Sequence, residues 1–562
     1  MVFAAGALKN ISADGANQKA LVQLSAVGVL SQAVKAQTEQ MLSAPPTPRE
    51  RGGGSSSKTS VRPTHVLEQL TATLRNVAVS GSSRKQFVSS GCVEELCKLM
   101  SVAPQHAELC LNVSRVLAKL SLHEDVRVRI DSTPEYIDAL MQALMLHAHD
   151  RPLLIRLCFI LGNLSAAHHT NREMIARIAL PLLLRLLAEH ADDAVGYASK
   201  VHSREVERRS LGTQSDGADG AAAADGAAGE GSEAEARPAG DDPAGADARD
   251  GAESPRAPDK EGSSKEGGSR SEATVATERL DVLVKLVRLL AHLAISPQIG
   301  ERIAVAPEAA SLLRLLQAHR VDGDDELQLN VVSAVTNLSY YVVEGSQLLA
   351  SHEALCIALV PALTVPHPEG QVEAARALGN LSRLGDARQT ICRVRVHEAL
   401  LLLLDHSSSH VAEAACGALI NLAADPPTRT ALLEVGAPAK LAALLLWLLS
   451  SPAPPPGQSE QLVSDIGAAL LAAKTLCNLC CGCSANPLDA RLTCELETRL
   501  ADPMPASWHS EAGSALIAEW PQAASLLLQL VARLPAADEG AFADGEEYEA
   551  APLDEYEELP LK

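Results

Sequence analysis

The sequence predicts an all-α fold in which one helical unit repeats along the chain. Aromatic residues make up only 2% of the 562 residues while Ala and Leu are abundant, which is typical of helices packed on helices. A short motif of the form Asn-Leu-Ser also recurs at nearly constant spacing. Because 47% of the residues are hydrophobic, the chain can bury a large core.

The recurring motif defines a ladder position, at which most copies have asparagine. The copies read "ALKNISAD" (7–14), "TLRNVAVS" (73–80), "ILGNLSAA" (160–167), "AVTNLSYY" (334–341), "ALGNLSRL" (377–384), "ALINLAAD" (418–425) and "LCNLCC" (476–481). Two weaker copies, "LAKLSLH" (117–123) and "LLAHLAIS" (289–296), have Lys119 and His292 instead. The ladder position thus falls at residues 10, 76, 119, 163, 292, 337, 380, 421 and 478. Five of the eight steps are 41 to 45 residues long, so we expect about nine repeats.

Each longer step contains a segment that reads as an insertion. The first contains "APPTPRERGGGSSSKTSVRP", the last contains "SSPAPPPGQSE", and the longest contains an acidic Gly/Ala-rich segment with few large apolar side chains. We predict partial repeats over 1–42, a disordered insertion over 43–63, repeats over 64–191, a disordered insertion over 192–275, repeats and a C-terminal cap over 276–535, and a disordered acidic tail over 536–562.

Each unit follows one internal plan. A polar turn after the ladder position leads to a short helix, a Leu-rich helix and a longer helix that carries the next ladder residue. Gly28, Gly91 and Gly436 are expected at the tight turn between the two short helices. Basic residues recur at the start of the first helix, either for contacts between repeats or for binding acidic segments: Lys19, Arg84, Arg127, Arg172, Arg302, Arg388 and Arg429.

This order, period and punctuation resemble the armadillo repeat family, and HEAT repeats fit the order less well. The resemblance implies a right-handed α-solenoid whose third helices line a concave groove for extended protein segments. It also implies that ladder asparagines bind the partner's backbone, since an amide both donates and accepts. The alternative is that each asparagine caps its own helix or ties adjacent repeats together. The matching positions are Asn76, Asn163, Asn337, Asn380, Asn421 and Asn478.

Import adaptors of this family have a tryptophan four residues before the ladder asparagine, where it helps to clamp lysine-rich signals. This chain has no tryptophan at those positions, which are Gly6, Ala72, Phe159, Ser333, Arg376, Gly417 and Lys474. We therefore do not expect recognition of nuclear-import signals. A transport or signalling adaptor of another kind remains the alternative function.

The cysteines of "LCNLCCGC" (476–483) raise the question of a metal site. Their spacing suits zinc, but Asn478 is a ladder residue, and only Cys494 is near as a further ligand. We expect small buried residues at a helix end, and no metal or other cofactor. No catalytic motif is present, so we expect no enzyme activity and no small-molecule substrate. A net charge of −22 disfavours nucleic-acid binding, and no uninterrupted apolar stretch of about 20 residues predicts a membrane span. Oligomeric state is left open.

Two segments narrow the resemblance. "RPLLIRLCFILGNLSAAHHTNREMIA" (151–176) and "SWHSEAGSALIAEWPQAASLLLQLVARL" (507–534) resemble a branch of the armadillo family that acts in building the axoneme of motile cilia and flagella. In that branch a tryptophan-bearing helix closes the solenoid, and Trp508 or Trp520 would fill this role. The resemblance implies a cytoplasmic and ciliary adaptor that carries or assembles protein cargo such as radial spokes. A permanent structural part of the axoneme is a further alternative.

Overall fold

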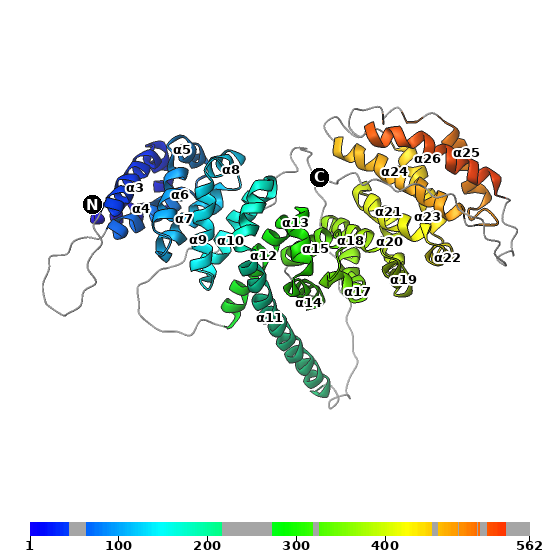
Figure 1. Cartoon of the computed structure of the whole chain (residues 1–562), viewed down its shortest axis with the longest axis horizontal. Coiled ribbons are helices and arrows are strands. Elements are labelled where there is room, and N and C mark those ends of the chain that lie inside the picture. The colour runs from blue at the N-terminus through cyan, green and yellow to red at the C-terminus, as the bar shows by residue number, and fades with distance from the viewer. Residues whose placement is uncertain are drawn as a thin grey trace, which may run out of the picture. The chain divides into compact units, whose positions relative to one another are not determined.

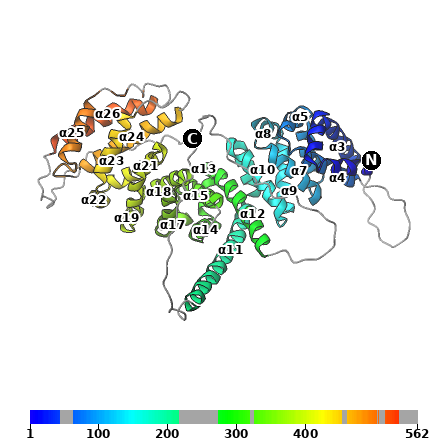
Figure 2. The ribbon, with the colours of Figure 1, turned by 180° about the vertical axis from the view of Figure 1, so that it is seen from behind.

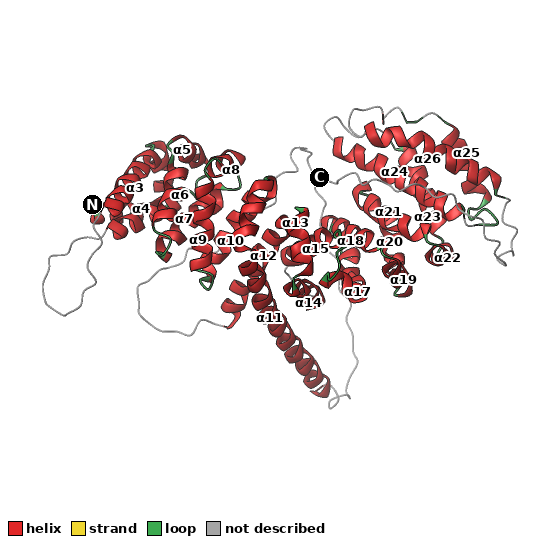
Figure 3. Cartoon of the chain, in the orientation of Figure 1, coloured by secondary structure: helices red, strands yellow, loops and turns green. Residues whose placement is uncertain are grey.

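A computed structural model describes residues 1–43, 63–215, 272–318, 325–451, 459–481, 483–502, 504–505, 508 and 514–534. All regular structure within these residues is helical, and the predicted all-α repeat fold is confirmed (Figure 3). The predicted acidic tail (536–562) and the central parts of both predicted insertions lie outside the described residues. The chain divides into two compact units: Met1–Ala198 with Ala276–Lys562, and Ser199–Val275.

Every ladder position lies within the last turns of a helix. Successive ladder helices pack side by side over residues 2–167 and again over 325–480, as the colour order in Figure 1 and the reverse view in Figure 2 show. The nine ladder helices are α1 (Val2–Ile11), α4 (Pro63–Val77), α7 (Ala107–Leu120), α10 (Arg151–Ala167), α12 (Glu272–Leu293), α15 (Asp325–Ser339), α18 (Pro368–Leu381), α21 (Ser409–Ala424) and α24 (Ser459–Cys480).

The remaining helices pack behind the ladder helices and share one apolar core with them. They are α2 (Gly15–Gln23), α3 (Ala26–Ser43), α5 (Arg84–Ser89), α6 (Cys92–Val102), α8 (Glu124–Asp131), α9 (Pro134–Leu146), α11 (His169–Ser215), α13 (Pro297–Val305), α14 (Ala310–Ala318), α16 (Gln347–Ala350), α17 (His352–Thr364), α19 (Gly385–Arg393), α20 (Val396–Leu402), α22 (Pro426–Glu434), α23 (Ala437–Ser450), α25 (Ala490–Ala501) and α26 (Ser514–Arg533). Short 3₁₀ turns are η1 (Gly81–Ser83), η2 (Pro307–Ala309) and η3 (Leu403–Asp405).

The tight turn between the two short helices uses a left-handed residue, but not always a glycine. Gly91 (φ 69°) and Gly436 (φ 75°) stand there as predicted. Gly28 does not, because it lies inside α3, and Ser25 (φ 55°) takes the left-handed conformation instead. Arg395 (φ 61°) does the same before α20. The turn geometry therefore persists even where its residue type changes.

The structure shows helix at both ends of the predicted disordered insertion at 192–275. Helix α11 continues through Ser215, and α12 already begins at Glu272. Residues 192–215 contain no proline and carry four acidic and four basic residues, unlike the acidic Gly/Ala-rich segment that follows them, and the glycines at 196 and 212 do not end the helix. α11 thus replaces the two short helices of its repeat by one long helix, with Pro181 inside it. The ladder resumes beyond the insertion, since the ring nitrogen Nδ1 of His292 in α12 lies 2.9 Å from the carbonyl oxygen of Gly162 in α10.

Helix α26 closes the C-terminal end of the ladder by packing on α24 and α25. Its buried residues, among them Trp520, Ala523, Leu527 and Val531, follow helical spacing on one face. Trp508 packs edge-to-face against Trp520 with ring centroids 5.2 Å apart, and both side chains are buried. The structure therefore uses both tryptophans in the cap, where the sequence predicted one of the two.

Two described helices are long and apolar enough to cross a membrane, judged by length and composition alone. They are α24, whose apolar window is 78% buried inside the protein, and α26, whose window is 28% buried. α22 and α23 would count as a third span only if taken together across their 78° bend. The apolarity of α24 follows from its place between α21 and α26 in the stack.

Candidate protein-binding surface

The ladder asparagines join neighbouring repeats. In each of the six predicted site residues, the side-chain Nδ2 donates to the preceding ladder helix. The acceptors are Lys9 O (3.4 Å) and Ser12 Oγ (3.0 Å) for Asn76, Ser121 Oγ (3.0 Å) for Asn163, Ala291 O (3.0 Å) for Asn337, Thr336 O (3.0 Å) and Ser339 Oγ (3.2 Å) for Asn380, Gly379 O (3.4 Å) and Ser382 Oγ (2.9 Å) for Asn421, and Ile420 O (3.3 Å) for Asn478. The role between repeats, which the sequence left as an alternative, is thus present at all six positions.

A serine two residues after the ladder position completes this link, and sequence reasoning missed it. Ser12, Ser121, Ser339 and Ser382 are fully buried, and each accepts from the next ladder asparagine. Each hydroxyl in turn donates to a carbonyl of its own helix, for example Ser382 Oγ to Gly379 O at 2.7 Å. The recurrence of serine in the motif was the available signal.

The link uses only part of each amide's hydrogen-bonding capacity. Asn337, Asn380, Asn421 and Asn478 remain partly exposed, and within the described residues their Oδ1 atoms accept no hydrogen bond. An amide also has a second N–H on Nδ2. These four side chains can therefore hold the repeats together and still present a donor and an acceptor to a bound backbone.

The two N-terminal ladder asparagines are less available. Asn163 is 7% exposed, and Asn76 Oδ1 accepts from the guanidinium of Arg75. The structure therefore favours the run Asn337, Asn380, Asn421 and Asn478 as the amide part of the surface. We call the exposed side of the ladder helices that carries these residues the ladder face.

Charge is divided along the ladder face. Its N-terminal part carries six basic residues on four consecutive ladder helices: Arg75, Arg115, Lys119, Arg156, Lys285 and Arg288. Further along, acidic residues predominate: Glu326, Glu369, Glu373, Glu413 and Asp465. The basic residues there pair with carboxylates, as Arg376 does with Glu373 (3.2 Å) and Lys474 with Glu519 (2.6 Å). The two parts of the face thus favour partner segments of opposite charge.

Burial changes the protonation of two carboxyl groups in the acidic part. Desolvation raises the pKa of Glu373, and it raises the pKa of Glu413 to about 7. The Glu413 carboxylate lies over Gly467 of the next ladder helix, where any side chain would collide with it. The close packing of α21 on α24 therefore buries this carboxyl group.

The basic residues at the first helix have a structural role in four repeats. The guanidinium groups of Arg127, Arg172, Arg388 and Arg429 donate to carbonyl groups at, or directly after, the C-terminal end of the preceding ladder helix, as Arg388 Nη1 does to Ser382 O at 2.9 Å and Arg383 O at 3.2 Å. A guanidinium at a helix C-terminus satisfies carbonyls that have no partner within the helix. These four arginines thus make contacts between repeats, and this one of the two predicted roles is confirmed for them.

Two predicted members of this set are wrong in position. In the first unit Gln18 Nε2, and not Lys19, donates to Ser12 O (3.0 Å). After α12 the corresponding residue is Gly300, so Arg302 lies two residues too late. The ring of Tyr341 fills the space over Gly300, and its hydroxyl donates to Ala294 O (2.6 Å). Arg84 instead pairs with Asp125 (3.6 Å).

Two of the cysteines at 477–483, Cys477 and Cys480, belong to the packing of α24. Cys477 and Cys480 are buried, and burial raises the pKa of the Cys477 thiol to about 12 and that of Cys480 well above its usual value. Cys481 and Cys494 are exposed. No group of three or more potential metal-ligating side chains is found among the described residues.

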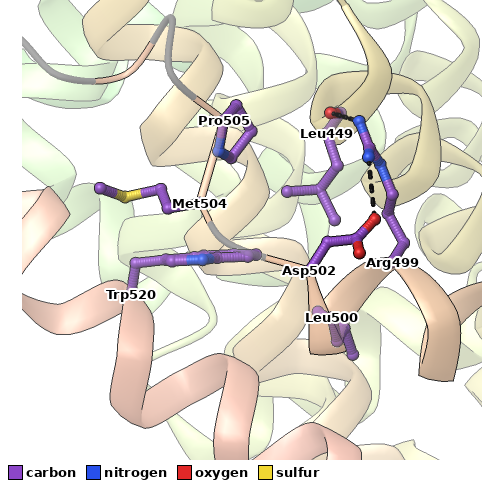
Figure 4. Close-up of a pocket in the computed structure, with 7 residues that line it drawn as sticks. All are labelled: Leu449, Arg499, Leu500, Asp502, Met504, Pro505 and Trp520. Atoms are coloured by element: carbon purple, nitrogen blue, oxygen red, sulfur yellow. Dashed lines mark hydrogen bonds and ion pairs between the residues drawn. The ribbon is translucent and has the colours of Figure 1, made fainter.

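A small pocket lies in the cap, away from the ladder asparagines. Figure 4 shows Trp520 and Met504 on one side, with Arg499 and Asp502 paired on the other (3.3 Å). Arg499 also donates to the carbonyl of Leu449. The residues that line the pocket therefore join α23, α25 and α26, and their contacts help to close the C-terminal end of the helix stack.

The repeated helical unit, the ladder and the arginine caps define an armadillo-type repeat fold. A solved structure of an engineered protein matches with a TM-score of 0.57 at 18% identity, over 95% of each chain, which supports the fold. No family model matches the chain.

Proteins of similar sequence show which armadillo repeat proteins the chain resembles. The chain is similar to armadillo repeat-containing protein 2 of Mus musculus (28% identity over 445 residues, 78% of this chain and 42% of the relative) and of Homo sapiens (26% over 386 residues, 67% and 37%). The more specific resemblance is thus confirmed. The chain spans about two-fifths of the length of these curated relatives.

Proposed function

We propose that the chain is a non-enzymatic adaptor that binds extended protein segments on its ladder face and serves the assembly or transport of axonemal complexes, such as radial spokes, in motile cilia and flagella. The observation that carries the binding role is the run of partly exposed amides at Asn337, Asn380, Asn421 and Asn478. Their spacing of one repeat offers a partner several weak contacts that add through effective concentration.

The axonemal setting rests on the resemblance to armadillo repeat-containing protein 2, which the two sequence segments indicated and the relatives support. An adaptor that delivers cargo would be found in the cytoplasm and in the cilium. Transport or signalling elsewhere in the cell is the competing function, and it predicts different partners.

A photo-crosslinking residue at Gly417 tests this proposal. Gly417 lies four residues before Asn421 on the ladder face, and its α-carbon faces open space. The matched control position is Arg185, which is exposed on α11 and so lies off the ladder face. In extracts of ciliated cells, we expect axonemal proteins to crosslink to position 417 and not to position 185.

Equal crosslinking at both positions would contradict binding on the ladder face. Crosslinks at position 417 to nuclear-transport or signalling proteins alone would keep the binding role and replace the axonemal setting by the competing function.

A further inference from the structure

The basic part of the ladder face forms one connected surface across repeats. We call the six residues Arg75, Arg115, Lys119, Arg156, Lys285 and Arg288 the basic strip. Arg75 of α4 reaches Asn112 of α7, with Nη1 3.1 Å from Oδ1. Phe159 of α10 lies between two charges of α12, with Lys285 Nζ 5.5 Å and the Arg288 guanidinium carbon 5.9 Å from its ring centroid.

The charge of the basic strip is opposite in sign to the net charge of the whole chain. The protein carries a net charge of −22, yet six basic residues gather on four consecutive helices. The same four helices hold eight Lys or Arg residues against five Asp or Glu residues, and Lys285 pairs with Glu326 of α15 (2.6 Å). Such a local reversal of charge attracts a negatively charged partner.

The geometry of the strip suits an extended acidic polypeptide. Packed helices lie about 8–10 Å apart, which an extended chain spans in about three residues. A segment crossing the four helices would thus need about ten residues, with carboxylates spaced along them. Compact anions would meet only one or two of the basic side chains.

We propose that the chain's own C-terminal segment, residues 535–562, occupies the basic strip. This segment lies outside the described residues and carries ten acidic residues against the single Lys562. Its acidic residues fall in groups at 538–539, 546–549 and 554–558, so a ten-residue stretch always contains several carboxylates. Tyr548 and Tyr556 add aromatic rings that pack against arginine.

This occupancy deepens the proposed function, on which it rests. A tethered segment binds at high effective concentration, so it would compete with an acidic cargo segment for the same surface. Cargo that binds the strip would then have to displace the tail. The tail thereby sets a threshold for cargo binding on the N-terminal part of the ladder face.

Fluorescence anisotropy with a labelled peptide of residues 535–562 tests the proposal on the full-length chain. In one protein, called the neutralised-tail protein, all ten acidic residues of the tail (538, 539, 544, 546, 547, 549, 554, 555, 557 and 558) are changed to the corresponding amides, while the other keeps the natural tail. We expect the neutralised-tail protein to bind the peptide at least about tenfold more tightly, because its own tail no longer competes.

Charge reversal locates the binding surface. In the neutralised-tail protein, Arg115→Glu with Lys119→Glu should weaken peptide binding by about tenfold or more. The control is Arg177→Glu with Arg185→Glu, which makes the same charge change at exposed positions of α11. A peptide with its own carboxylates neutralised should lose binding to the unaltered strip, and this comparison does not depend on how the variants fold.

Absence of peptide binding, or equal loss in the strip and control variants, would overturn the proposal. Equal binding to the natural and neutralised tails would also overturn it and leave the strip for a partner's acidic segment. In each case, crosslinking of cargo at position 417 would still report on the proposed function separately.

Discussion

At the scale of single residues, the ladder asparagine does two things with one side chain. In Asn421, for example, Nδ2 ties the repeat to the preceding one, and Oδ1 accepts no hydrogen bond within the described residues. Sequence reasoning could name the six positions, because the motif recurs. It left the two roles as alternatives, because the hydrogen-bond partners lie 39 to 67 residues away in the sequence.

The two roles can be separated by a pair of variants. Asn421→Ala removes the link to Ser382 and also the partly exposed amide, whereas Ser382→Ala removes only the buried hydroxyl, which accepts from Asn421 and donates to Gly379 O. We expect each to cost about 1 kcal/mol of unfolding free energy, measured by urea denaturation. Only Asn421→Ala should weaken binding of the partner crosslinked at Gly417. Equal weakening by both variants would mean that the asparagine acts solely through structure.

The thiols should react according to burial. Cys481 and Cys494 are exposed, whereas Cys477 and Cys480 are buried with raised pKa values. We expect N-ethylmaleimide to modify Cys481 and Cys494 at least about tenfold faster than Cys477 and Cys480 in the native protein, as followed by peptide mass spectrometry. Protection of Cys481 and Cys494 that a chelator abolishes would contradict this account and favour zinc.

Glu413 should make stability depend on pH. Its pKa rises from 4.5 to about 7 on folding, so the folded state holds a proton between these values while the unfolded chain has lost it. The contribution of Glu413 to stability is complete below pH 4.5 and is lost as the pH rises through about 7, at a cost of about 3 kcal/mol. Glu413→Gln should remove this part of the pH dependence, measured by chemical denaturation, while Glu344→Gln at an exposed site should not. Parallel curves for Glu413→Gln and the unaltered protein would contradict the assignment.

At the scale of elements, different residue types donate hydrogen bonds to the carbonyl groups at the C-terminal ends of the ladder helices. Arginine caps the end of the ladder helix in four repeats, Gln18 does so in the first unit, and Tyr341 replaces it after α12. The sequence predicted the common arginine. It could not predict Tyr341, because this residue comes from the following repeat and reaches back over Gly300.

Because the Tyr341 ring packs over Gly300, adding a methyl group should change the stability differently at Gly300 than at a glycine with open space beside it. Gly300→Ala would drive a Cβ into the Tyr341 ring and should destabilise the protein by about 1–3 kcal/mol. Gly417→Ala in α21 meets nothing and should stabilise by up to about 1 kcal/mol. Thermal melting compares the two variants. A neutral Gly300→Ala would mean that Tyr341 does not occupy this space.

At the scale of the whole chain, the repeat period made the fold predictable and the insertions made its boundaries less so. The nine ladder helices lie where the motif placed them, because local helix propensity and repeat packing agree. The segment 192–215 is polar and contains two glycines, and composition alone did not show that α11 continues through it. The division of charge along the ladder face needed the structure, because it depends on which side chains share an exposed surface.

The most direct test of the adaptor account is the protein composition of flagella from cells that lack this chain, measured by quantitative mass spectrometry. The cells are rescued with the natural protein, with Asn337, Asn380, Asn421 and Asn478 all changed to Ala, or with Ser339 and Ser382 changed to Ala as the control. We predict selective loss of one axonemal complex without the chain, and recovery with the natural and serine-variant proteins but not with the asparagine variant. A normal axoneme in cells without the chain, or full rescue by the asparagine variant, would contradict the account.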